Sequence, residues 1–248
     1  MNFDSKRGKL MKDVFRKLST IDAGKVLDAA TGKGEFIQVI QHNFQSYSQI
    51  IGIDSSEKSV QFAQKLFPGN DVEIYRMDLR DIHFADSYFD TVCISNSLHH
   101  LEDFDKVMAE LIRVLRPGGL FLITEMFKDG KQTAAQQTHI NMHHWISKID
   151  RISGVYHGET FTKDEIISLV MQLPLVNLEI EDFYYPVDNP KEAKNCENLL
   201  KNCKDTIKRL ENGGVNQELI LEGHDIISRI STIGCASASR LLITAQKK

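Results

Sequence analysis

Short apolar runs alternate with helical repeats through the first half of the chain. Five continuous apolar segments between polar turns predict strands, at residues 25–30, 50–54, 72–77, 91–95 and 120–125. Amphipathic repeats predict helices, at residues 4–19, 34–43 and 57–66. A further helix is predicted between the last two strands and ends at Pro117-Gly118-Gly119. This alternation indicates right-handed βαβ units and hence a mainly parallel α/β sheet.

The alternation changes after residue 125. Helical patterns are predicted at about 132–151, from about Thr162, at 190–211 and at 217–230; apolar runs lie at 175–185 and 239–245. We therefore expect one domain over residues 1–248, with helical lid insertions at about 130–172 and 190–232 that cover one end of the sheet. The helices of the second insertion leave two alternatives open, closure over a pocket or a homodimer contact.

Composition and charge narrow the classes of partner. The chain has 248 residues, a formal net charge of −4 and no long run of Lys or Arg, which argues against a nucleic-acid partner. No segment approaches 18 consecutive apolar residues, and the N-terminus lacks an apolar signal core. We therefore expect no membrane span and a cytoplasmic location.

The four cysteines show no C-x-x-C pair and no spacing typical of zinc sites. Cys93 lies in an apolar strand-like run and is expected in the core. Cys196 and Cys203 lie seven residues apart on one face of a predicted helix, so we expect packing residues in a reducing compartment.

An acidic residue and a run of small residues follow the first predicted strand. Asp28 comes at its carboxyl end, and the sequence Ala30-Thr31-Gly32-Lys33-Gly34 leads into the next helix. Glycine lets the backbone approach a ligand closely, and a helix N-terminus presents unpaired N–H groups. Such loops occur in nucleotide, flavin and S-adenosylmethionine (SAM) binders; the structural alternative is a tight turn that requires positive φ.

Two more carboxylates end the second and third predicted strands. Asp54 can accept hydrogen bonds from both ribose hydroxyls of a nucleoside, and its structural alternative is the N-cap of the following helix. Asp78 can accept a hydrogen bond from the exocyclic amine of adenine. Together they predict an adenosine site, which by itself specifies no reaction.

Five segments in this order and spacing resemble class I SAM-dependent methyltransferases, at residues 26–36, 50–54, 75–79, 89–101 and 115–123. The resemblance is strongest to the small-molecule branch that includes the ubiquinone/menaquinone-biosynthesis type. It covers about residues 26–125 and is weaker in the last two strands. It implies a doubly wound, seven-stranded, mainly parallel sheet whose last strand is antiparallel, with helices on both faces. It also implies SAM as methyl donor and S-adenosylhomocysteine as product.

The resemblance assigns cofactor contacts to individual positions. The residues expected around the methionine part of SAM are Asp28, Ala30, Thr31, Gly32 and Gly34. The residues expected around the ribose, the adenine and the sulfonium are Asp54 with Ser55, Asp78 with Leu79, and Ser95 with Asn96. Ala30 stands where the family usually has the first glycine of a triplet, which is tolerable if its φ is negative.

The resemblance implies in-line transfer of a methyl group to a small-molecule acceptor. Ser95-Asn96-Ser97-Leu98 replaces the Asn/Asp-Pro-Pro-aromatic motif of amino-group methyltransferases that act on adenine or glutamine. No Tyr is followed four residues later by Lys, which disfavours a short-chain dehydrogenase. The alternatives are a methyltransferase that acts on RNA or protein, and a non-catalytic SAM-binding protein.

The histidine-rich stretch supplies the candidates for a general base. His139 and His143 lie four residues apart and share a helix face, so either is a candidate catalytic residue. Solvated or packed histidines are the alternative, and for His100 a packed position is preferred. The pattern lacks a Glu in metalloprotease spacing and a cysteine partner, so no metal is expected.

Overall fold

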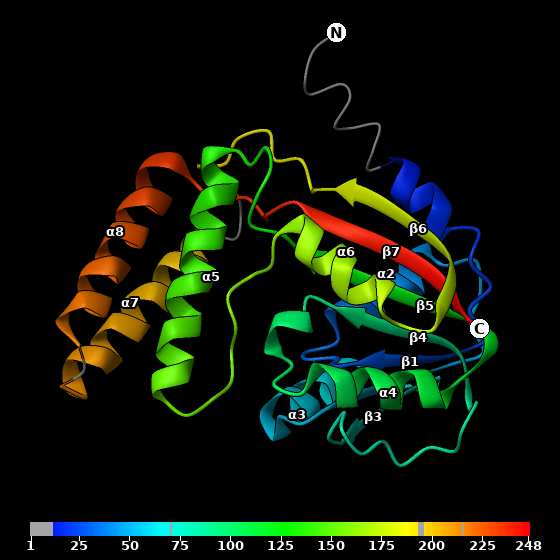
Figure 1. Ribbon diagram of the computed structural model, residues 1–248. Helices are drawn as coiled ribbons and strands as arrows, with labels where there is room; N and C mark the ends of the chain where they lie inside the picture. Colours follow the sequence, from blue (N-terminus) through cyan, green and yellow to red (C-terminus); the bar gives the residue numbers. More distant parts are fainter. Residues whose placement is uncertain (1–11, 70, 193–195, 215) are drawn as a thin grey trace, which may run out of the picture. The chain divides into compact units, whose positions relative to one another are not determined.

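The computed structural model describes residues 12–69, 71–192, 196–214 and 216–248 (Figure 1). The first helix covers residues 12–18, and the part of its expected range at 4–11 lies outside the described residues. The strands are β1 (Lys25–Ala29), β2 (Gln49–Asp54), β3 (Val72–Arg76), β4 (Phe89–Ser95), β5 (Leu115–Met126), β6 (Leu175–Phe183) and β7 (Arg240–Lys247). The remaining helices are α2 (Glu35–Asn43), α3 (Glu57–Leu66), η1 (Leu98–His100), α4 (Phe104–Val114), α5 (Ala134–Ile152), α6 (Lys163–Met171), α7 (Cys196–Asn212) and α8 (Gln217–Ile233).

Within the described residues, seven strands form one sheet in the order β3-β2-β1-β4-β5-β7-β6. Six strands are parallel and the last is antiparallel. The chain moves outward from β1 through α2 and α3, then returns to the centre and moves the other way through α4 (Figure 1). Right-handed crossovers place the helices of the two halves on opposite faces. The doubly wound fold expected from the sequence is therefore confirmed.

The chain adds strands in opposite directions from β1 and from β4, and this change of direction positions the site. These two strands pair in parallel, with Ala29 opposite Ile94, so their carboxyl ends lie at the same edge of the sheet. In open α/β sheets, ligands bind outside the carboxyl ends of the strands at such a switch point. The residues that follow β1 and β4 are therefore the first place to look for a binding site.

One strand is longer than the sequence predicts. β5 begins at Leu115, directly after α4, and includes Pro117-Gly118-Gly119 rather than starting at residue 120. Leu115 pairs with Phe89, and the register shifts between Phe89 and Thr91. Proline has no N–H to donate to a regular ladder, so the irregular pairing accommodates Pro117 within the strand.

The chain divides into two compact units. Unit 1 contains the sheet and comprises the described residues up to Glu125, with Ile166–Phe183 and Leu241–Lys248. Unit 2 comprises Met126–Glu165 and Tyr184–Arg240 and contains α5, α7 and α8. The lid role expected of the helical insertions stays a prediction. No described helix is long and apolar enough to cross a membrane.

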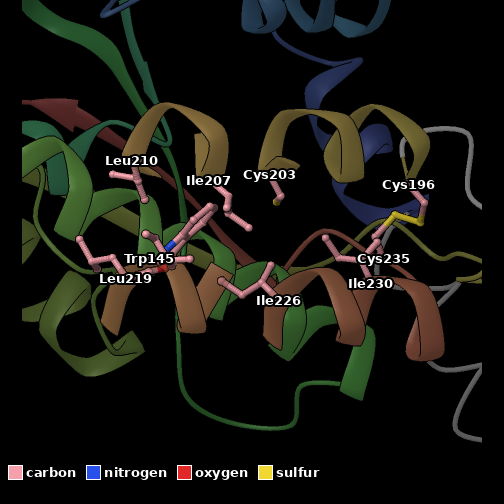
Figure 2. Packing of buried hydrophobic residues seen from close by; sticks show 10 residues of the cluster. Trp145, Cys196, Cys203, Ile207, Leu210, Leu219, Ile226, Ile230 and Cys235 are labelled. Atoms are coloured by element: carbon pink, nitrogen blue, oxygen red, sulfur yellow. A yellow bond between two sulfur atoms is a disulfide. The ribbon is translucent and has the colours of Figure 1, made fainter. Parts of the chain in front are cut away.

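Unit 2 has its own hydrophobic core around Trp145 (Figure 2). The Trp145 side chain is buried, and its Nε1–H donates a 2.8 Å hydrogen bond to the carbonyl oxygen of Leu219. Ile207 of α7 and Ile226 of α8 belong to the same cluster. The indole N–H of Trp145 is the only polar group of this large buried side chain, and it has the hydrogen-bond partner that a buried polar group requires.

The expectation for Cys196 was wrong. Cys196 forms a disulfide with Cys235, which joins the start of α7 to the residue after Gly234 at the end of α8 (Figure 2). Cys203 is free and buried in the core of unit 2, as expected, and Cys93 is buried in the sheet. Disulfides are rare in reducing compartments, and the cytoplasmic location stays a prediction.

Candidate functional site

The ends of three strands of unit 1 are joined by hydrogen bonds. The Gly32 amide, in the loop after β1, donates a 2.9 Å bond to Oδ2 of Asp54 at the end of β2. The Met77 amide, just after β3, donates a 3.0 Å bond to the carbonyl oxygen of Asp54. The loop at residues 30–34, Asp54 and the segment before Asp78 therefore lie at one edge of the sheet.

The loop after β1 has an unusual backbone. Ala30, Gly32 and Gly34 all have positive φ, of 53°, 55° and 85°. The sequence interpretation accepted Ala30 on condition of a negative φ, and that condition is not met. A non-glycine residue held in this region costs on the order of 1–3 kcal/mol, and such strain clusters at functional sites. A Cβ added at Gly32 would meet nothing within 4 Å, so the space beside this glycine is open.

Asp28 is a buried carboxyl group beneath this loop. It accepts a 2.5 Å hydrogen bond from Oγ1 of Thr31. Burial raises the pKa of Asp28 to about 7, the nearby charge of Asp54 raises it further, and the Thr31 hydrogen bond opposes both. Asp28 therefore changes its protonation state near neutral pH, where most Asp residues are fully ionised.

Asp54 does not cap the helix that follows it. Its Oδ1 accepts a 2.8 Å hydrogen bond from the Ser56 amide, and the N-cap of α3 is Ser56, whose side chain accepts from Ser59. Ser55, between them, is exposed. A carboxylate can accept about four hydrogen bonds, and only two protein donors contact Asp54 among the described residues. The remaining lone pairs suit a pair of ribose hydroxyls.

Asp78 follows β3 and is exposed, with Leu79 half-buried beside it. Arg80 forms a salt bridge of 2.7 Å with Oδ2 of Asp78, and its side-chain hydrogen bonds lower the pKa of Asp78. The sequence interpretation overlooked Arg80, although a cation two positions after a carboxylate was visible. A bound adenine amine would have to share Asp78 with this guanidinium.

Ser95 and Asn96 end β4 on the other side of the switch point. Oγ of Ser95 lies 2.7 Å from Oγ1 of Thr124, and the Asn96 side chain donates a 3.2 Å bond to Oγ of Ser95. Asn96 has a φ of 49°, so each of the two strands at the switch point is followed by a strained non-glycine residue. Oδ1 of Asn96 is buried and accepts no hydrogen bond within the part of the chain that the structure describes. A buried, unpaired acceptor of this kind is typical of a ligand contact.

A buried carboxylate–imidazole pair was missed by the sequence analysis. Oε1 of Glu125, at the end of β5, lies 2.9 Å from Nδ1 of His99, and Oε2 accepts a 2.8 Å bond from the Leu98 amide. Both side chains are fully buried. His100, for which a packed position was preferred, is exposed instead. The available signal was Glu125 itself, an acidic residue at the end of an apolar strand, because a buried carboxylate needs a partner.

The two candidate bases in unit 2 differ in their surroundings. Nδ1 of His139 accepts a 3.1 Å hydrogen bond from the Ala238 amide. Burial, with the charge of Arg240, lowers the pKa of His139 to about 4. A ring whose lone pair is used and whose basicity is low is a poor proton acceptor at neutral pH. His143, one turn further along α5, is half-buried and keeps the proposed role.

Comparison with known proteins agrees with this geometry. Residues 27–123 match the family model described as a methyltransferase domain. A ubiquinone/menaquinone biosynthesis C-methyltransferase of Desulfotalea psychrophila is 36% identical over 106 residues, which cover 43% of each chain. The chain thus spans less than half the length of this relative. An O-methyltransferase of Penicillium expansum, named cnsE, is 23% identical over 96% of this chain and 78% of its own.

A solved structure extends the likeness to the whole fold. Phosphoethanolamine N-methyltransferase 2 of Haemonchus contortus, in complex with S-adenosylhomocysteine, has a TM-score of 0.56 and 16% identity. The match covers 97% of this chain and 52% of that chain. The chain therefore resembles class I SAM-dependent methyltransferases, whose fold it shares. Within that class it resembles the ubiquinone/menaquinone-biosynthesis type, as the sequence motifs indicated.

Proposed function

We propose that the protein is a SAM-dependent methyltransferase that transfers a methyl group to a small-molecule acceptor by in-line displacement. One observation carries the proposal: the Gly32 amide and the Asp54 carboxylate, from two strand ends, meet at 2.9 Å at the switch point of the sheet. A glycine loop and a carboxylate so arranged form a nucleoside site in wound α/β folds. The matched methyltransferase domain supports SAM as that nucleoside.

The residues present fit SAM on their own chemistry. Gly32 offers open space for close approach, Asp54 retains acceptor capacity, and Oδ1 of Asn96 is a buried acceptor without a partner in the described residues. When bound, SAM supplies a methyl group activated by a positively charged sulfur. Asp54 would hold the ribose, Asp78 and Leu79 the adenine, and Asn96 with Ser95 the sulfonium end.

The chain's own contribution is mainly orientation. Holding an acceptor atom in line with the transferable methyl supplies on the order of 7–11 kcal/mol of barrier lowering. A general base adds roughly 10²–10⁴-fold only if the acceptor must lose a proton. We propose His143 for that role, since the lone pair of Nδ1 in His139 is already used.

A small-molecule acceptor is supported by the names of the relatives. The Desulfotalea psychrophila protein is named a C-methyltransferase of quinone biosynthesis, and the Penicillium expansum protein an O-methyltransferase. The net charge of −4 also disfavours docking to RNA phosphates. We therefore propose an acceptor that presents an oxygen or an activated carbon.

Incubation of the purified protein with methyl-labelled SAM and a panel of phenols, quinols and short RNAs tests this function. We expect label in a phenol or quinol and none in RNA. Label in RNA alone would overturn the small-molecule assignment. Cofactor binding without transfer to any acceptor would favour the non-catalytic alternative.

A further inference from the structure

Two histidines of unit 2 lie together although fourteen residues separate them. His143 is on α5, and His157 is in the segment that follows this helix. Their ring centroids are 4.9 Å apart, with the rings nearly perpendicular. A ring nitrogen of His143 and a ring nitrogen of His157 lie within 4.8 Å of each other. Two imidazole nitrogens this close are a pair of donors of the kind that transition metals prefer.

Asp150 fixes the orientation of one of these rings. Nδ1 of His157 lies 2.7 Å from Oδ2 of Asp150, and the His157 side chain is almost fully buried. Because an ionised carboxylate only accepts, Nδ1 carries the proton and Nε2 carries the lone pair of the neutral ring. Histidines that ligate metals almost always donate their other N–H to a carboxylate, carbonyl or water in this way.

The neighbouring histidines of α5 do not share this arrangement. The lone pair of Nδ1 in His139 accepts the Ala238 amide. Nε2 of His144 lies 2.7 Å from the hydroxyl of Thr160. His139 and His144 thus contact Ala238 and Thr160, whereas a nitrogen of His143 and a nitrogen of His157 lie within 4.8 Å of each other.

We propose that His143 and His157 bind a divalent first-row transition metal ion such as Zn²⁺, with Asp150 as the residue that orients His157. Tetrahedral zinc with Zn–N bonds of 2.0–2.1 Å needs ligand nitrogens roughly 3.3 Å apart. Nitrogens within 4.8 Å of each other lie at most about 1.5 Å beyond that spacing. Sequence spacing alone does not pair these two histidines, because the segment after α5 folds back to bring His157 to the helix.

A purely structural pair makes a different prediction. If the bond between His157 and Asp150 only anchors the segment after α5, removing His143 leaves any metal affinity unchanged. If the pair is a metal site, His143 and His157 contribute similarly, and Asp150 contributes through the orientation of His157.

The test is titration of the full chain, without a histidine tag and after treatment with EDTA, with Zn²⁺ in a calorimeter and with Co²⁺ in an absorption spectrometer. We expect stoichiometric binding, with Co²⁺ bands typical of nitrogen ligands. His143→Ala and His157→Ala should each weaken Zn²⁺ binding at least tenfold, and Asp150→Ala about 10–100-fold. His42→Ala and His224→Ala, both at exposed positions on other helices, are controls that should bind as the wild type does.

Absence of stoichiometric binding by the wild-type chain would overturn the proposal, as would full affinity in His143→Ala. Circular dichroism identifies a variant that fails to fold. If His157→Ala unfolds, the half-buried His143→Ala variant and Asp150→Ala decide the result. The titration needs neither SAM nor an acceptor, so its outcome does not depend on methyl transfer. A bound metal ion would occupy the lone pair that His143 needs as a general base, so stoichiometric binding would exclude His143 from that role.

Discussion

The Gly32 amide donates a 2.9 Å hydrogen bond to Oδ2 of Asp54, across the carboxyl ends of β1 and β2. This bond joins the turn that opens α2 to the carboxylate that precedes α3. Both groups therefore lie at the edge of the sheet where we propose that the nucleoside of the cofactor binds. The binding and stability of the domain should therefore respond to the charges of this edge.

The buried Asp28 should make unfolding depend on pH. The pKa of Asp28 is about 7 in the native state, against an ordinary value of 3.8. As pH rises, the unfolded chain therefore loses this proton at a lower pH than the native chain does. Stability from this group is fully present below about pH 4 and is lost as pH rises through 7, by about 4 kcal/mol. Asp28→Asn keeps an acceptor for Thr31 and removes the titration. The free energy of unfolding of the variant, measured with denaturant at pH 5 and pH 8, should rise relative to that of the wild type as pH increases. A difference between the two proteins that does not change with pH would contradict the assignment.

His139 should impose the opposite pH dependence. Its native pKa of about 4 lies below the ordinary 6.5, so its contribution is present above pH 6.5 and is lost as pH falls toward 4. The loss is at most about 3 kcal/mol, because the side chain keeps some access to water. His139→Asn retains an acceptor for the Ala238 amide and does not titrate. Thermal unfolding between pH 4 and pH 7 should be flatter for the variant, and an identical pH profile would argue against a buried neutral ring.

Gly223 of α8 should not tolerate a side chain. A Cβ there would lie 2.6 Å from Cζ2 of Trp145 and 2.9 Å from Cγ1 of Ile207. Alanine gains about 1 kcal/mol in helix propensity, but overpacking costs about 1–3 kcal/mol. We expect Gly223→Ala to lower the free energy of unfolding, while Ser228→Ala on the exposed face leaves it nearly unchanged. A double-mutant cycle with Trp145→Phe should show a coupling; additive effects would exclude the contact.

The disulfide should stabilise unit 2. Cys196 and Cys235 close a loop with a sequence separation of 39 residues, for which chain entropy predicts about 2–4 kcal/mol. Reductant should therefore lower the unfolding temperature of the wild type. It should not affect the double variant Cys196→Ala, Cys235→Ala, and Cys203→Ala should respond as the wild type does. A wild type insensitive to reductant would show that the bond contributes little.

The sequence predicts local structure and the strand-end residues well, for a physical reason. The apolar period places α3 at Glu57–Leu66, as observed. Asp54 was recognisable as a candidate because it is a carboxylate at the end of an apolar strand, and its contact with the ribose stays a prediction. The pairs that form between distant residues were not recognisable. Glu125 meets His99 26 positions away, and Cys196 meets Cys235, because the fold rather than the spacing brings them together.

Isothermal titration of the wild type and Asp54→Ala with SAM and S-adenosylhomocysteine tests the central claim most directly. The wild type should bind both ligands. Loss of a charged hydrogen-bond acceptor costs about 1.5–3 kcal/mol, so Asp54→Ala should bind roughly 10–150-fold more weakly. Asp164→Ala, at an exposed position on α6, is the matched control and should bind normally. A wild type that binds neither ligand, or an Asp54→Ala variant with unchanged affinity, would contradict the account.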